Sequence, residues 1–335
     1  MAQRIEHLAR VYDGLRTFVG ENVTFKYGDI LYVSTRNNDE YDMIIHADGV
    51  HNFLELYRMK QEEAYTPVSD PADLAGLAGS DIRVDSDEVA NAFSASSPYF
   101  RNVVISGTEV SQSVVVKSTE RTTLEGVTIS GGKGSTNGKI IYAANELYLR
   151  DISAKDGSTL YNAFEGYQTT TDPEYNGISL LVAENLNIDC PSLTHNIINV
   201  YTPADNAEII IRNSKFNLTV DNSNVLRLAN YMNAVNVSVT FENCDWTYEN
   251  GTSFNDWKWA GLAIYQPSAS DLALNGDYSR IATWKFLFNN CSYNGTKVKE
   301  NGFGQHNQVL YMYDLGRTGA VSNPSDIEGM QVTFK

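Results

Sequence analysis

The stretch Ile209-Ile-Ile-Arg-Asn-Ser-Lys-Phe-Asn217 contains the pattern that decides the fold. Apolar Ile211 stands two residues before Asn213, and Phe216 stands three residues after it. Such alternation is the period of a half-buried β-strand. Asparagine tolerates a left-handed backbone, so Asn213 predicts a sharp bend between two short strands.

The same pattern recurs through the chain after residue 100, with small or apolar residues at equivalent places around each bend. The predicted bends are Gly107, Gly126, Asp151, Asn185, Asn213, Asn243 and Asn290. Glycine, aspartate and asparagine share a tolerance of positive φ. A bend that recurs at the same place in each repeat predicts coils stacked on one another, which is a β-solenoid.

A second repeated segment follows the bends at a constant distance. Its copies are Asn196-Ile-Ile-Asn-Val-Tyr201, Asn224-Val-Leu-Arg-Leu-Ala229, Ala260-Gly-Leu-Ala-Ile-Tyr265 and Gln308-Val-Leu-Tyr-Met-Tyr313, with a weaker copy in Lys139-Ile-Ile-Tyr-Ala143. Thirteen residues separate Asn185 from Ile198, and thirteen again separate Asn213 from Leu226. A constant offset between two landmarks favours coils that repeat the same strands.

Successive bends are 19, 25, 34, 28, 30 and 47 residues apart. Coils that keep their strands but vary in length place the variation in outer loops. This irregular spacing resembles the right-handed parallel β-helix of pectate lyases and phage tailspikes, the pectin-lyase-like superfamily. The resemblance covers residues 101–335 and is architectural, without singling out one family. It implies a mainly β fold built as a right-handed parallel β-helix.

Residues 1–100 do not carry the repeat. Residues 1–61 combine helical spacing near the start with strand-like segments, which predicts a small α+β module. Residues 62–100 are rich in Asp, Ser, Ala and Glu, which predicts an acidic linker or arm leading to the β-helix of residues 101–335. The module either docks onto another protein or caps the open end of the solenoid, since such ends need covering.

Within the module, four strand-like segments form two predicted pairs. Segments 23–27 and 30–34 flank a Gly-Asp turn and predict one pair. Segments 43–46 and 52–57 flank Asp-Gly and predict the other.

The composition excludes two classes of partner. The chain carries 25 Lys and Arg against 41 Asp and Glu, a formal net charge of −16. Such a chain should be repelled by nucleic acid and by anionic membranes. No apolar run approaches the length needed to span a bilayer, and the first residues lack the pattern of a secretion signal. We therefore expect neither a nucleic acid nor a membrane as a partner.

The three cysteines, Cys190, Cys244 and Cys291, lack metal-ligand spacing. Cys244 and Cys291 occupy the same column of the repeat and are predicted to point inward as small apolar thiols. They could stack on neighbouring coils, although synthesis in a reducing cytoplasm argues against a designed disulfide. No metal and no cofactor is predicted.

Parallel β-helices often cleave polysaccharides, which makes a polysaccharide-cleaving enzyme the first functional hypothesis. The pectinase-like families carry Asn-x-Asp, Asp-Asp and Gly-His-Gly motifs on successive coils, and only Asn187-Ile-Asp189 matches here. A lyase would need a cluster of calcium-binding carboxylates and a basic residue, and the nearest candidates are Arg150, Asp151, Lys155 and Asp156. The bend explains Asp151 sufficiently. No catalytic residue is predicted, although a site shared between subunits stays open.

The second repeated segment presents an unusual outward face. Alternation assigns Ile198 and Leu226 to the interior and leaves apolar and aromatic side chains outside. The members singled out are Ile197, Tyr201, Val225, Tyr265, Val309, Tyr311 and Tyr313. Self-association along a symmetry axis would bury them, glycans could stack on the tyrosines, or long loops could cover them. We favour an oligomer interface, because Val and Ile beside Tyr suit protein contact.

Together these features predict a non-enzymatic structural protein of a tailed-bacteriophage virion, of tailspike, fibre or capsid-decoration type. It would form a homotrimer, attach to other virion proteins through residues 1–100 and contact host surface glycan. A solenoid without an export signal fits a particle assembled in the host cytoplasm and released by lysis. The alternatives are a polysaccharide depolymerase, lyase or hydrolase, acting on host glycan, and a bacterial surface adhesin whose leader has been removed.

Overall fold

A computed structural model describes residues 23–25, 30–34, 40–44, 49–51, 64–130, 138–155, 162–167, 175–190, 196–218, 224–229, 233–248, 262–266, 279–293, 295–297, 310–314, 319–321 and 328–335. The chain forms two compact units, Met1–Tyr65 and Thr66–Lys335.

The described part of the first unit consists of two antiparallel strand pairs. Strand β1 (Val23–Phe25) pairs with β4 (Gly49–His51), and β2 (Ile30–Ser34) pairs with β3 (Glu40–Ile44). The predicted pairing of segments 23–27 and 30–34 is therefore wrong. The intervening sequence 35–39, Thr-Arg-Asn-Asn-Asp, is itself rich in turn formers, which explains the reversal between β2 and β3. The predicted first helix and segment 52–57 lie outside the described residues.

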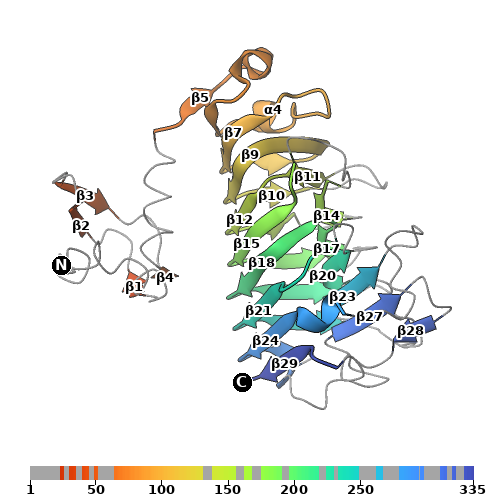
Figure 1. Cartoon of the computed structure of the whole chain (residues 1–335). Helices are drawn as coiled ribbons and strands as arrows, with labels where there is room; N and C mark the ends of the chain where they lie inside the picture. The colour runs from red at the N-terminus through yellow and green to blue at the C-terminus, as the bar shows by residue number, and fades with distance from the viewer. Residues whose placement is uncertain are drawn as a thin grey trace. The chain divides into compact units, whose positions relative to one another are not determined.

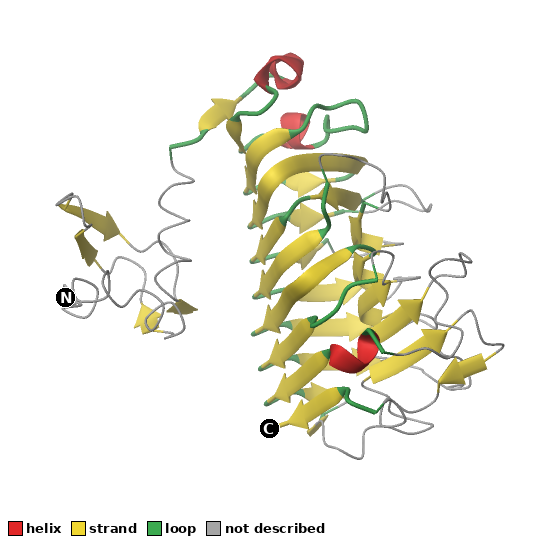
Figure 2. Cartoon of the chain, in the orientation of Figure 1, coloured by secondary structure: helices red, strands yellow, loops and turns green. Residues whose placement is uncertain are grey.

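The second unit consists mainly of short strands stacked in three sheets (Figures 1 and 2). Sheet 1 contains β5 (Thr66–Val68), β6 (Asp81–Val84), β7 (Phe100–Ser106), the end of β9 (Ser113–Glu125), β12 (Glu146–Arg150), β15 (Ile178–Glu184), β18 (Pro203–Arg212), β21 (Ser238–Glu242), β24 (Lys285–Asn289) and β29 (Gln331–Phe334). Every neighbouring pair in this sheet is parallel.

Sheet 2 contains β8 (Glu109–Val110), β10 (Thr128–Ile129), β13 (Ser153–Ala154), β16 (Asn187–Cys190), β19 (Lys215–Leu218), β22 (Asp245–Tyr248), β25 (Ser292–Tyr293) and β26 (Thr296–Lys297). Sheet 3 contains the start of β9, β11 (Lys139–Ala143), β14 (Asn162–Gly166), β17 (Asn196–Val200), β20 (Asn224–Ala229), β23 (Leu262–Gln266), β27 (Leu310–Asp314) and β28 (Gly319–Val321). In these sheets only β26 and β28 pair antiparallel, among the described strands.

From β7 onward the chain visits sheets 1, 2 and 3 in turn and then begins the next coil, as the colour gradient in Figure 1 shows. Strand β9 turns the corner from sheet 3 to sheet 1 and therefore belongs to both. The prediction of a mainly β fold is confirmed, and the parallel sheets are compatible with a β-solenoid. Three short helical segments, η1 (Pro71–Leu77), α4 (Asp87–Ala90) and η2 (Ile281–Thr283), complete the described elements.

The predicted acidic arm is wrong over residues 64–100. Strand β5 pairs parallel with β6, and β6 pairs parallel with β7, so this segment forms the first strands of the stack. Ile82 and Val84 are fully buried, and the acidic side chain of Asp81 pairs with Arg101 of β7. The alternation is only four residues long in β6, which is why the polar composition around it dominated the prediction.

The seven predicted bend residues lie between a sheet 1 strand and a sheet 2 strand. Their φ angles are positive: Gly107 64°, Gly126 61°, Asp151 53°, Asn185 55°, Asn213 52°, Asn243 51° and Asn290 50°. The backbone N–H at each bend donates to the next coil, as between Asn213 N and Glu242 O at 2.9 Å. Each corner is therefore tied to its neighbour by a hydrogen bond parallel to the stack.

Inward-pointing side chains stack in register to form one continuous core. Ile211 of β18 lies beside Phe241 of β21, which lies beside Phe288 of β24. The rings of Phe241 and Phe288 are stacked with centroids 5.4 Å apart, and Phe334 continues the stack at the same spacing. The last described coils are therefore held by an aromatic ladder.

Candidate functional site

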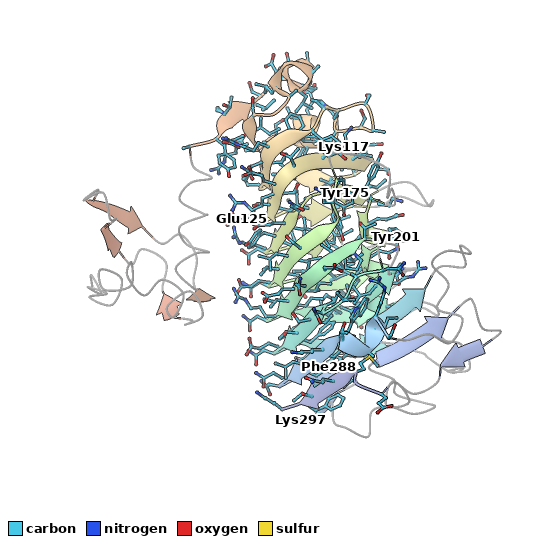
Figure 3. The ribbon with its side chains drawn as sticks, viewed as in Figure 1. Lys117, Glu125, Tyr175, Tyr201, Phe288 and Lys297 are labelled. Atoms are coloured by element: carbon cyan, nitrogen blue, oxygen red, sulfur yellow. The ribbon has the colours of Figure 1, made fainter. Side chains whose placement is uncertain are left out.

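Polar side chains meet on the outward face of sheet 3. Glu165, Asn199 and Arg227 occupy equivalent positions of β14, β17 and β20, each directly beside the next. Lys139 of β11 and Tyr201, which follows β17, lie against this row. We call these five residues the sheet 3 cluster. Figure 3 shows Tyr201 on the side of the stack away from Glu125.

A buried asparagine ladder aligns the three strands that carry the row. The Asn196 side-chain amide donates to Asn162 Oδ1 at 3.2 Å, and the Asn224 amide donates to Asn196 Oδ1 at 2.9 Å. Each asparagine begins its strand, three residues before Glu165, Asn199 or Arg227. The ladder therefore fixes the register that brings the cluster together.

Glu165 has the most partners in the cluster. Its carboxylate forms an ion pair with Lys139 and accepts hydrogen bonds from Asn162 Nδ2 at 3.1 Å and from Tyr201 Oη at 3.3 Å. Both charged side chains of the pair are largely buried, with exposed fractions of 16% for Lys139 and 12% for Glu165. Pairing and hydrogen bonding offset the cost of taking these charges out of water.

Asn199 differs from its neighbours. Its side chain is fully buried, yet among the described residues neither its amide nitrogen nor its amide oxygen has a hydrogen-bond partner. Buried polar groups are nearly always paired, so this amide stands apart from the other members of the row. Its carbonyl oxygen, in contrast, accepts a hydrogen bond from Tyr142 Oη at 3.2 Å.

Tyrosines contribute aromatic surface and hydroxyl donors around the cluster. The Tyr201 ring lies under the guanidinium group of Arg227, 5.8 Å from its centroid. Burial raises the pKa of Tyr142 well above its ordinary value, and burial raises the pKa of Tyr175 to about 12. Both hydroxyls therefore stay protonated near neutral pH and serve as hydrogen-bond donors or acceptors, not as bases.

A second polar row lies on sheet 1, one residue before each bend from Gly126 onward. Its members are Glu125, Arg150, Glu184, Arg212 and Glu242, followed by Asn289. The signs alternate from coil to coil, and we call this row the charge ladder. Arg212 donates to Glu184 Oε2 at 2.9 Å in a largely buried ion pair. Such pairs oppose a slip of one coil against the next.

The structure describes the side chains of only some members of the predicted outward stripe. Ile197 and Val225 are 0% exposed and belong to the hydrophobic core, and Tyr201 is 6% exposed. The prediction that these three face solvent is wrong, because they are already packed within this chain. Tyr265 lies on β23, and Tyr311 and Tyr313 lie on β27, but their side chains are outside the described residues, as is all of Val309.

Over the described ranges, no group of three or more His, Cys, Asp and Glu side chains could hold a metal ion. In the same part of the chain, no helix is long and apolar enough to cross a membrane. The sheet 3 cluster supplies one carboxylate, whereas hydrolysis of a glycosidic bond ordinarily uses two. Its other groups are suited to hydrogen bonding and stacking.

Comparison with protein-family models, curated proteins and solved structures finds no match for this chain. The function is therefore inferred from the residues themselves.

The sequence reading missed Lys139 and Glu165 as members of a site. A usable signal was present, because an asparagine follows the bends Asp151, Asn185 and Asn213 by eleven residues in each case. That constant offset marks Asn162 as the start of another copy of the second repeat. Glu165 then falls into the same outward row as Asn199.

Proposed function

We propose that this chain is a non-enzymatic structural protein of a tailed-bacteriophage virion, of tailspike, fibre or capsid-decoration type. The observation that supports it is the stack of in-register parallel coils in Thr66–Lys335. We further propose that the coils form a right-handed parallel β-helix, since parallel crossovers within one sheet are almost always right-handed. A stack of this kind gives a stiff body with repeated sides, which suits a part that projects from a particle.

Attachment to other virion proteins is assigned in this proposal to the compact unit Met1–Tyr65. The sequence predicted attachment through residues 1–100. The proposal is limited to the first unit because residues 66–100 contribute strands to the stack. The flanking genes provide the direct test, and portal, capsid or tail genes are the expected neighbours. A neighbourhood of cell-wall or secretion genes would favour the adhesin.

The homotrimer remains part of the proposal. Ile197 and Val225 no longer support it, because both are buried within one chain. The support that remains is the architectural resemblance and the tyrosines of β23 and β27. Light scattering at micromolar concentration should give three times the mass of the chain. A monomer would remove the trimer from the proposal.

Host surface glycan is the proposed ligand of sheet 3. Arg227 is a half-buried cation over the Tyr201 ring, and Lys139 supplies a second cation to the same cluster, a combination that suits sugars and acidic sugars in particular. Binding to a glycan array without turnover is the expected result. Arg227→Ala should weaken that binding, whereas Lys155→Ala on sheet 2 should leave it unchanged.

A polysaccharide depolymerase is the second candidate, and the surroundings of Glu165 are what favour it. A buried carboxylate beside the Tyr201 hydroxyl and Lys139 is an arrangement that acid–base catalysis can use. Incubation with acidic and neutral polysaccharides, following reducing ends and the absorbance of unsaturated products, separates the two candidates. Turnover that disappears in Glu165→Gln would establish the depolymerase.

A further inference from the structure

Cys244 and Cys291 occupy the position directly after two successive bends. Strands β22 and β25 are parallel and pair Asp245 with Ser292, so the residues just before them are neighbours on adjacent coils. The Ser292 N–H donates to the Cys244 carbonyl at 2.9 Å. Adjacent strands lie about 4.8 Å apart, and the Cα atoms of disulfides are roughly 4.4–6.8 Å apart.

The side chains of Cys244 and Cys291 are both buried at these neighbouring positions. Hydrogen bonding between the two thiols raises the pKa of Cys244 and lowers the pKa of Cys291. Each Sγ also contacts the carbonyl two residues earlier, at 3.3 Å for Cys244 and 3.4 Å for Cys291. Both thiols are free and buried.

We propose that Cys244 and Cys291 form an oxidation site, at which a peroxide converts the two thiols into a disulfide joining adjacent coils. The Cys291 thiolate attacks one peroxide oxygen, the O–O bond breaks, and a sulfenic acid and water result for hydrogen peroxide. The Cys244 sulfur then displaces the hydroxyl group from the Cys291 sulfur, losing its proton, and a second water leaves. Two thiols and one peroxide thus give one disulfide and two waters.

The stack itself selects this pair. The third cysteine, Cys190, lies on β16 directly beside Leu218 of the next coil, so it has no cysteine partner in register. A small oxidant suits the buried pair better than a bulky disulfide. The Cys244–Cys291 disulfide would link the coils that carry the aromatic ladder. This proposal does not depend on whether the chain belongs to a virion.

The test uses the full chain, reduced and then treated with hydrogen peroxide. Unreacted thiols are alkylated in denaturant, and the intact mass is measured. The reduced chain has three cysteines and takes three alkyl groups. The oxidised chain should take one, lose two hydrogens and yield a linked Cys244–Cys291 peptide. Unfolding in denaturant should become at least about tenfold slower.

Serine variants provide matched controls. Ser214 occupies the same column one coil earlier and makes the same contact, donating to the carbonyl of Arg212 at 2.7 Å. Cys244→Ser and Cys291→Ser should therefore fold and should show no peroxide-dependent change in unfolding rate. Cys190→Ser should still form the link, with no alkyl group after oxidation. Three alkyl groups after peroxide, a link that contains Cys190, or a sulfinic acid at Cys291 beside a free Cys244 would each overturn the proposal.

Discussion

Asn243 has a φ of 51°, and its side chain lies between those of two other bend residues. Its amide donates to Asn213 Oδ1 at 3.1 Å, and its own Oδ1 accepts from Asn290 Nδ2 at 2.8 Å. The residue thus has two separable roles. It adopts a left-handed backbone, and it continues a ladder of amides along the corner.

Two substitutions at this position separate those roles. Asn243→Ala and Asn243→Gly both remove the amide ladder, but only alanine is strained at positive φ. We expect the alanine variant to lose about 1 kcal/mol more of the free energy of unfolding than the glycine variant. Urea denaturation measures the difference. Asn187→Ala, at an exposed strand position on β16, serves as the control and should change stability little.

Gly166 gives a second prediction, because its missing side chain makes room for Tyr142. A Cβ built there would lie 3.2 Å from the carbonyl oxygen of Asn199 and 3.4 Å from Tyr142 Oη. Gly166→Ala should therefore destabilise the chain by about 1–3 kcal/mol through overpacking. Gly76→Ala, where a Cβ would meet nothing within 4 Å, is the matched control. Equal stability of the two variants would contradict the close packing at Gly166.

The bends could be predicted from the sequence because tolerance of positive φ belongs to each residue type alone. The sheet 3 cluster could not be predicted in the same way. Glu165 is neutralised by Lys139 from the preceding coil and hydrogen-bonded by Tyr201 from the following one. Such a site exists only after three coils have stacked.

At the scale of strands, the charge ladder helps to determine the register in which neighbouring strands pair. An inward apolar side chain can pack against almost any apolar neighbour, but the buried Glu184 needs a cation beside it. Arg212 supplies that cation from the next strand, and Asn213 Nδ2 donates to the second oxygen at 3.4 Å.

Glu184→Gln should remove the buried carboxylate that Arg212 contacts at 2.9 Å and lower the free energy of unfolding by about 3 kcal/mol. Chemical denaturation at neutral pH measures this loss. Lys155→Gln removes a cation from the exposed pair with Glu109 and should have a small effect. A loss at Glu184 as small as that at Lys155 would show that the ladder contributes little to stability.

The pairing of β6 with β7 predicts a pH dependence. Arg101 Nε donates to Asp81 Oδ1 at 2.7 Å, and this bond holds the pKa of Asp81 below its ordinary value of 3.8. The folded-state pKa is depressed, so the stabilisation is present above the unfolded pKa and is lost as pH falls through the folded pKa. Asp81→Asn should therefore cost about 0.5–1 kcal/mol at pH 7, because the pair is partly exposed. Denaturation at several pH values should show the two proteins converging below pH 3.8.

The error over residues 64–100 also belongs to the scale of single strands. β5 and β6 contain three and four residues, too few for a period of two to stand out from acidic surroundings. Their burial depends on β7, which follows much later in the chain. Repeats reveal themselves by recurrence, and the first strands of a stack have no earlier copy to be compared with.

For the molecule as a whole, each coil of Thr66–Lys335 contacts chiefly the coils before and after it. The fold class therefore followed from recurrence alone, without knowledge of any loop. The sequence separates the first residues from the solenoid because the repeat is missing from them. The structure divides the chain into two units near residue 65. Oligomeric state depends on surfaces that the repeat does not specify, and it stays a prediction.

Because the charges along sheet 1 alternate in sign from coil to coil, removing one turn and removing two turns should have different effects. Deleting residues 185–212 removes one turn of the coil, joins Glu184 to Asn213 and brings Glu184 beside Glu242. Deleting residues 151–212 removes two turns and brings Arg150 beside Glu242, which restores opposite charges. The shorter protein should therefore resist urea better than the longer one, and Glu242→Arg should rescue the single deletion. If the length of the stack alone set its stability, the protein lacking one turn would resist urea better than the protein lacking two. Duplications within the stack could then add one turn as readily as two.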